Sequence, residues 1–311
     1  MATLPVHAEI EQATSLLPEA AHRQTSMARL VLRTFVKNKL AVIGLVIVVL
    51  IVLFCFVGPI FYRTDQVYTN IMASNEGPSW GHLLGTDNNG YDILGRLMVG
   101  GQSSIEIGLA VAAVATLFGV VYGAIAGYFG KFLDAIMMRV VDILLAVPVV
   151  FLFIFVSQAI STDTFQKYAF WLLIVVLSGL SWLGPARLVR GETLSLRTRE
   201  YVQAVKVMGG RSRRIVLRHI IPNTLGTIIV NATFQVADAI LILAVLQYLG
   251  FALPPPAATW GQMLSQGSTF LADGYWWQVY PALVAIILVV VAFNFIGDAL
   301  RDSFEVRLQE R

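Results

Sequence analysis

Charged residues are scarce in this sequence of 311 residues. Asp, Glu, Lys and Arg together make up 13% of the chain, whereas hydrophobic residues make up 57%. A soluble globular domain ordinarily carries about 25% charged residues. The composition therefore excludes a soluble globular domain and predicts an all-α membrane protein that crosses the bilayer several times.

Cysteine and histidine are scarce as well. The single cysteine, Cys55, excludes an internal disulfide and lies in an apolar run, where we interpret it as a packing residue. The four histidines are scattered without the spacing of metal ligands. No metal site is therefore predicted.

A nucleotide-binding loop is missing from the sequence. The one Gly-Lys pair, Gly130 and Lys131, is followed by Phe132, and no glycine lies five residues before Gly130. The apolar runs also lack the paired acids, the Ser and His, or the metal cluster that an intramembrane enzyme needs. The chain is therefore not expected to be an enzyme, and any ATP that drives it must be hydrolysed by another subunit.

Six apolar runs are long enough to cross a membrane: 40–60, 107–128, 143–160, 168–184, 224–249 and 279–296. Because about 20 apolar residues span the hydrocarbon core, these runs predict six membrane-spanning helices. Pro148 predicts a kink in the third run. In the second run, small residues recur at every fourth position and predict close helix packing: Ala115, Gly119, Gly123 and Gly127.

Lys and Arg are distributed unevenly between these runs. Of the 22 basic residues, 19 lie in four stretches, 1–39, 129–142, 185–223 and 297–311, which hold 5, 2, 9 and 3 in turn. The positive-inside rule places these stretches and both termini in the cytoplasm. The predicted order is a cytoplasmic tail (1–39), a first span (40–60), an extracytoplasmic loop (61–106), a five-helix core (107–300) and a cytoplasmic tail (301–311). The core includes a cytoplasmic loop (185–223) and an extracytoplasmic loop (250–278).

Two short helices that meet at a glycine hinge are predicted between residues 198 and 223. Thr198 and Ser212 are expected to cap them, and Gly209 with Gly210 ends the first, since glycine adopts the left-handed C-cap without steric cost. One face of the first helix is apolar: Tyr201, Val202, Val205 and Met208. A helix this short is marginal in water, so it is expected to dock on a partner or to lie on lipid headgroups.

The fifth run has a polar face made of residues three or four positions apart: Thr224, Thr227, Asn231, Gln235 and Asp238. An ionised Asp238 near the middle of a span costs about 2.5 to 3.5 kcal/mol on insertion scales, so this face must meet water, substrate or a polar partner. We expect it to line a translocation pathway in which Asp238 meets a cationic group. The alternative is a polar seam that joins two helices.

The stretch from 198 to 223 resembles the Glu-Ala-Ala, Gly, Leu-Pro motif of ABC importer permeases, through Gln203, Ala204, Val205, Gly209, Ile221 and Pro222. Gln203 and Val205 replace the motif's Glu and second Ala. In that family the loop inserts a coupling helix into a cleft of the cytoplasmic ATPase subunit. The resemblance implies an ATPase-coupling set of eight residues: Glu200, Tyr201, Val202, Gln203, Ala204, Val205, Met208 and Gly209.

Two further stretches resemble the dipeptide, oligopeptide and nickel permease group of these importers. Residues 85–96, GTDNNGYDILGR, match its Gly-Thr-Asp signature except at Tyr91 and Gly95, and residues 249–267 match its Pro-rich segment followed by Trp-Gly-x-Met-Leu. In the family this side faces the substrate-binding protein. The candidate contact residues are Asp87, Arg96 and Trp260.

The resemblance implies the type I importer permease fold and a multi-pass subunit of the plasma (inner) membrane. The implied cargo is a dipeptide or oligopeptide, with nickel as the alternative. Implied partners are a second homologous permease subunit, two ATPase subunits that bind ATP and Mg, an extracytoplasmic binding protein and membrane lipid. No cofactor bound by this chain and no nucleic acid are expected. A secondary transporter driven through Asp238 is the alternative from another class.

Overall fold

Helices make up nearly all of the described part of the chain. The computed structural model describes residues 32, 34–158, 162–251 and 253–309, in which the only β pairing is the isolated bridge between Thr86 and Asp92. Five helical runs in these residues are long and apolar enough to cross a membrane: Lys39–Phe61, Ile93–Phe129, Asp163–Ser181, Ser212–Tyr248 and Trp276–Phe304. The prediction of an all-α membrane protein with several spans is confirmed.

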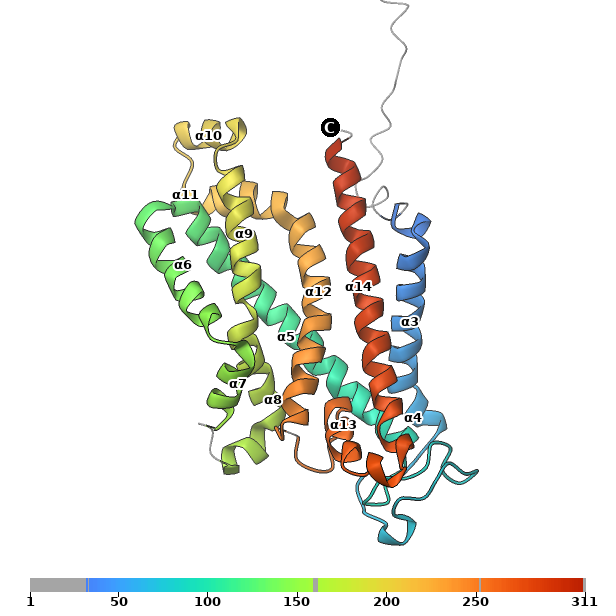
Figure 1. Cartoon of the computed structure of the whole chain (residues 1–311). Coiled ribbons are helices and arrows are strands. Elements are labelled where there is room, and N and C mark those ends of the chain that lie inside the picture. The colour runs from blue at the N-terminus through green and yellow to red at the C-terminus, as the bar shows by residue number, and fades with distance from the viewer. Residues whose placement is uncertain (1–31, 33, 159–161, 252, 310–311) are drawn as a thin grey trace, which may run out of the picture.

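The described part of the chain contains the following α-helices: α3 (Lys39–Phe56), α4 (Gly58–Phe61), α5 (Ile93–Phe129), α6 (Lys131–Ala146), α7 (Val149–Gln158), α8 (Thr162–Ser181), α9 (Leu183–Leu196), α10 (Glu200–Val207), α11 (Ser212–Ile215), α12 (Ile221–Tyr248), α13 (Trp260–Ser268) and α14 (Tyr280–Gln309). A π-helical turn, η2 (Val216–Ile220), joins α11 to α12. Short 3-10 turns lie at 71–73, 271–273 and 276–278. Figure 1 shows α10 across one end of the bundle, and α13 with the loop before α5 at the other end.

The long helix α5 runs diagonally through the molecule and contacts most of the other spans (Figure 1). It begins at Ile93 because the Asp92 carboxylate accepts a hydrogen bond from the Gly95 amide at 2.8 Å, which caps the helix. The predicted span began at 107. Residues 93–106, predicted as part of an extracytoplasmic loop, are therefore helical.

The predicted third span, 143–160, is divided between two helices. Helix α6 ends at Ala146 and α7 begins at Val149, so Pro148 marks a break between helices rather than a kink within one. Neither α6 nor α7 is among the five long apolar runs, and the last two residues of the predicted span lie outside the described residues. The expected count of six spans thus differs from the five long helices found.

Small residues of α5 allow it to pack closely against α9. A Cβ added at Gly119 would lie 2.6 Å from the Pro185 side chain, and one at Gly127 would lie 2.7 Å from the Thr193 Cβ. A Cβ at Gly123 would overlap the main-chain oxygen of Ala186. The small-residue stripe is therefore packing between two helices of the same chain, as predicted.

Two ion pairs attach α6 to α9. Arg190 donates from Nε and Nη2 to the two oxygens of Asp134 at 2.5 and 2.7 Å, and Arg187 donates to Asp142 at 2.5 Å. The hydrogen bonds that Arg190 donates to Asp134 raise the pKa of the Arg190 guanidinium. A bidentate pair of this kind fixes the orientation of both side chains. The helices α5, α6 and α9 therefore form one connected unit next to α10.

Candidate functional site

Helix α10 has the position and the hinge that the sequence predicts, but not the predicted caps. Gly209 follows it with a φ of 81°, a conformation that favours glycine. Thr198 does not cap α10, because its hydroxyl donates to the Ser195 carbonyl at 2.8 Å and Arg199 occupies the N-cap position. Ser212 is the first residue of α11 and is not its cap.

The two sides of α10 differ in what they contact. Val202 is only 1% exposed and packs with Ile215 and Ile220 in a small apolar cluster that also includes part of Val205. The large apolar residues exposed on or directly after α10 are Tyr201, Val207 and Met208, which are 43%, 87% and 78% exposed. We call these three side chains the exposed α10 surface.

The predicted coupling residues therefore fall into two groups, one exposed and one buried. Tyr201, Met208, Glu200 and Ala204 lie on exposed positions of α10. Val202 is buried in the chain's own core and is not available to a partner. Val207 belongs to the exposed surface and was missed, although an apolar pair directly before a helix-ending glycine is a usable signal.

Gln203 is engaged within its own loop. Its Nε2 donates to the main-chain oxygen of Arg197 at 2.7 Å. The guanidinium of Arg197 in turn donates from Nη1 to the Gly127 carbonyl at 2.8 Å, near the end of α5. Because the last four carbonyls of a helix have no partner in the helix, this arginine caps α5. A displacement of α10 is thereby connected to the end of α5.

On its other side, α10 is connected to α12. The run Ser212–Tyr248 is continuous and includes α11, the turn η2 and α12, so the predicted second short helix is the start of the fifth span. Pro222 lies in the first turn of α12, directly after the π-helical turn. Proline has no amide hydrogen and its ring displaces the carbonyl one turn earlier, which accounts for the wider turn at this point.

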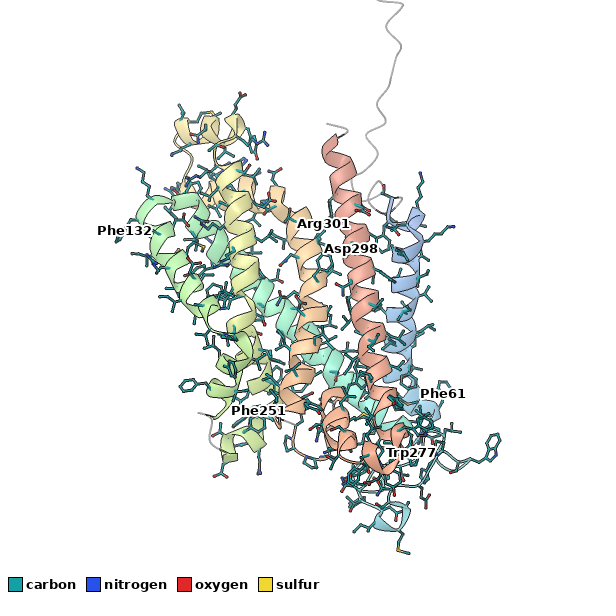
Figure 2. The ribbon with its side chains drawn as sticks, viewed as in Figure 1. Phe61, Phe132, Phe251, Trp277, Asp298 and Arg301 are labelled. Atoms are coloured by element: carbon teal, nitrogen blue, oxygen red, sulfur yellow. The ribbon has the colours of Figure 1, made fainter. Side chains whose placement is uncertain are left out.

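The polar residues of α12 do not all line the same pocket. The Thr227 hydroxyl donates to Oε1 of Glu192 on α9 at 3.3 Å, and both residues line a pocket of about 340 Å³ together with Asn231. The pocket lies between α9, α12 and α14, where it also meets Arg301, and Figure 2 shows Arg301 on α14 toward the α10 end of the bundle. Two of the four predicted pathway residues are therefore brought together.

The other two predicted pathway residues, Gln235 and Asp238, do not line this pocket. Gln235 is buried and donates from Nε2 to the Ser181 carbonyl at 3.2 Å, so it joins α12 to the end of α8. Asp238 is exposed on the surface of α12 and has no hydrogen bond or ion pair to the described residues. The seam interpretation thus applies to Gln235, whereas Asp238 remains available to a group outside the chain.

The loop before α5 is built around a buried ion pair. Asp87 and Arg96 lie 3.6 Å apart, with side chains 8% and 4% exposed. The Asp87 carboxylate accepts hydrogen bonds from the amides of Asn89 and Tyr91 at 2.9 Å, and the Arg96 guanidinium lies 4.4 Å from the centroid of the Tyr91 ring. Burial raises the pKa of the Asp87 carboxyl, an effect that these hydrogen bonds and Arg96 oppose.

The three residues predicted to contact a binding protein do not have exposed side chains. Asp87 and Arg96 are buried, and their ion pair and hydrogen bonds lie within the loop and the start of α5. Trp260 is also buried, with its indole Nε1 donating to the Leu97 carbonyl at 2.9 Å, and it packs beside Gly101 together with Cys55. The burial of Cys55 confirms its interpretation as a packing residue. The large apolar side chains exposed in this part of the chain are instead Phe61, Tyr68, Ile71, Met72 and Trp80. Figure 2 labels Phe61 at this end of the bundle.

Comparison with known proteins identifies the family. Residues 119–310 match the model of the binding-protein-dependent transport system inner membrane component. The chain belongs to this family. Residues 26–78 match a second model, the N-terminal transmembrane domain of oligopeptide transport permease C. The resemblance to ABC importer permeases is thereby confirmed.

Relatives of this family member cover most of its length. It is 39% identical to the oligopeptide transport system permease protein OppC of Bacillus subtilis (strain 168), over 89% of this chain and 88% of the relative. It is 36% identical to the protein of the same name from Haemophilus influenzae, over 95% and 94%. It is 34% identical to the dipeptide transport system permease protein DppC of Bacillus subtilis (strain 168), over 89% and 85%.

Proposed function

We propose that this chain is the membrane-spanning permease subunit of an ATP-driven, binding-protein-dependent importer of dipeptides or oligopeptides. The cargo is supported by the names of the three relatives, all of which refer to peptides and none to nickel. The observation that carries the coupling role is α10, which exposes Tyr201, Val207 and Met208 at the end of the bundle. Apolar side chains exposed together on a short helix are typical of a surface that a partner covers.

In this proposal two separate ATPase subunits bind ATP and Mg and dock on the exposed α10 surface. Their closure displaces α10. Arg197 and Val202 pass the displacement to α5 and to the start of α12, since both residues connect α10 to those helices. The bundle then moves as packed units between an inward and an outward opening, as in other rigid-body transitions.

The remaining partners follow from the same assembly. A second homologous permease subunit forms the other half of the pathway, and Asp238 on the surface of α12 faces that pathway. An extracytoplasmic binding protein delivers the peptide at the end formed by α13 and the loop before α5. The excess of Lys and Arg supports an orientation in the plasma membrane with α10 and both termini in the cytoplasm.

Cysteine crosslinking tests the docking of α10. The only native cysteine, Cys55, is buried, so a cysteine introduced at Met208 or Tyr201 is the accessible thiol. In membranes with active import, a bifunctional thiol reagent is expected to join Met208→Cys and Tyr201→Cys variants to an ATP-binding polypeptide. Val202→Cys is the matched negative control on the same helix, because that position is buried.

Two outcomes would count against the proposal. Active import without capture of an ATP-binding polypeptide from either exposed position would remove the docking role. Uptake by the chain alone in vesicles, driven by a proton gradient without nucleotide, would instead show a secondary transporter that uses Asp238.

A further inference from the structure

Four arginines gather where the chain enters α12. Arg211, Arg213, Arg214 and Arg218 line a pocket of about 340 Å³, and the one other lining residue is Leu217. All five side chains are exposed. None of the four guanidinium groups has a hydrogen bond or an ion pair with the part of the chain that the structure describes. We call this group the arginine pocket.

Other arginines of the same cytoplasmic stretch do have partners. Arg187 pairs with Asp142, Arg190 pairs with Asp134, and Arg197 donates to main-chain carbonyls of α5. The arginine pocket is different because the sequence contains no Asp or Glu between Glu200 and Asp238. The negative charge that balances these four residues must therefore come largely from outside this segment.

The position of the pocket favours a lipid as the source of that charge. Ser212–Tyr248 is one continuous run long enough to cross the bilayer, and Arg218 precedes the first residue of α12 by only three positions. At about 3.6 residues per turn, Arg218 lies within one turn of α12, and the other three arginines of the pocket lie about two to three turns before it. Leu217 and, further along the same run, Leu225 and Ile229 are exposed apolar side chains.

We propose that the arginine pocket binds the phosphate group of an anionic phospholipid. Guanidinium groups bind phosphate oxygens through paired hydrogen bonds, and the exposed leucines offer contacts to acyl chains on the membrane side. Clusters of basic residues beside a span are attracted to anionic lipid headgroups. The bound lipid would hold the segment between Gly209 and α12 at the membrane surface, so transport would depend on anionic lipid.

Lipid binding by the purified full-length chain, together with the subunits that copurify, tests this proposal. The probe is phosphatidylglycerol, compared with phosphatidylcholine, and bound lipid is measured by native mass spectrometry. Arg214→Gln and Arg218→Gln are each expected to lower the affinity for phosphatidylglycerol about fivefold, and the triple variant R213Q/R214Q/R218Q about a hundredfold. The matched control K37Q/K39Q/R139Q removes three exposed positive charges from other stretches that the distribution of Lys and Arg places on the cytoplasmic side. This control should change the affinity for phosphatidylglycerol less than about twofold.

Three results would overturn the proposal. The single and triple variants could bind phosphatidylglycerol as tightly as the control variant does. Inorganic phosphate at millimolar concentration could displace the lipid signal, which would indicate a site for a free anion. Lipid binding could be unchanged while an ATP-binding polypeptide is lost, which would assign the arginines to a protein interface. The assay needs no transport, so its failure is distinct from failure of the proposed function.

Discussion

Arg197 donates from Nη1 to the main-chain oxygen of Gly127 at 2.8 Å, and this bond joins the segment before α10 to the end of α5. In Arg197→Ala we expect import to fall about tenfold or more, because a charged hydrogen bond of this kind contributes about 1.5 to 3 kcal/mol and no other side chain that the structure describes donates to this carbonyl. ATP hydrolysis by the assembled transporter should continue. The measurement is peptide uptake per ATP hydrolysed in proteoliposomes.

Arg199 provides the control for this variant. It lies two residues further along, its side chain is exposed, and it has no side-chain partner among the described residues. Arg199→Ala should leave the ratio of uptake to hydrolysis unchanged. Equal loss in the two variants would mean that the general positive charge of the loop matters, and the bond to Gly127 does not.

Val202 on α10 and Met208 at its C-cap are both apolar, but we expect the first to affect folding and the second to affect attachment of the ATPase subunits. Val202→Ala removes buried contacts with Ile215 and Ile220 and should lower the free energy of unfolding by about 1 to 3 kcal/mol. Met208→Ala should leave folding unchanged and weaken the attachment of the ATPase subunits. Thermal unfolding in detergent and copurification of ATP-binding polypeptides measure the two effects. The reverse pattern would contradict the assignment of faces on α10.

Long apolar runs were the most predictable part of this fold. The fifth run is expected at 224–249, and α12 occupies Ile221–Tyr248, because length and hydropathy are strong signals for a segment that enters a bilayer. The start of α5 at Ile93 was not predictable in the same way, since it depends on the Asp92 carboxylate, which also accepts hydrogen bonds from distant Tyr62 and His82. Such contacts form only in the folded chain.

The candidate site was predictable to the level of segments but not of side chains. Local signals located α10 and its hinge at Gly209, since left-handed backbone favours glycine. Helical periodicity could not show that Val202 would be buried, because its partners Ile215 and Ile220 come from another helix. For the same reason, the pairing of Asp87 with Arg96 in the interior was missed, since charged residues are mostly exposed.

The buried pair of Asp87 and Arg96 is expected to stabilise the loop before α5. Asp87→Ala or Arg96→Ala leaves one buried charge without its partner, which costs about 3 to 5 kcal/mol of unfolding free energy. The double variant should cost less than the sum of the two, because the second substitution removes the unpaired charge. Additive losses in this double-mutant cycle would show that the two side chains act independently.

The same carboxyl predicts a pH dependence. Burial raises the pKa of Asp87 in the folded protein, so the folded state binds this proton more tightly than the unfolded state does. The stability from this group is present below the unfolded pKa of about 3.9 and is lost as the pH rises through the raised folded pKa. Asp87→Asn should remove this part of the pH profile in thermal unfolding. An unchanged profile would assign it to other groups.

Two glycines test the contact between α5 and α9, because Gly123 lies in the contact and Gly191 does not. Gly123→Leu should prevent close packing, because any Cβ at this position overlaps the Ala186 carbonyl of α9. We expect a loss of folded chain in membranes, measured by immunoblot and by limited proteolysis. Gly191→Ala, on α9, meets no atom within 4 Å and should be tolerated or stabilising by about 0.5 to 1 kcal/mol.

Asp238 and Gln235 lie one turn apart on α12, and only Asp238 is free to act outside the chain. Gln235→Ala removes the hydrogen bond to Ser181 and should lower stability by about 1 kcal/mol while leaving the substrate concentration for half-maximal uptake unchanged. Asp238→Asn keeps the size of the side chain and removes its charge, so folding should be unaffected. If the carboxylate meets the ammonium group of a peptide in the pathway, uptake of free dipeptides should fall several-fold, whereas uptake of N-acetylated dipeptides should change little. Loss of stability in Asp238→Asn with an unchanged preference between the two substrates would place this carboxylate in a contact between helices, either within the chain or with the second permease subunit.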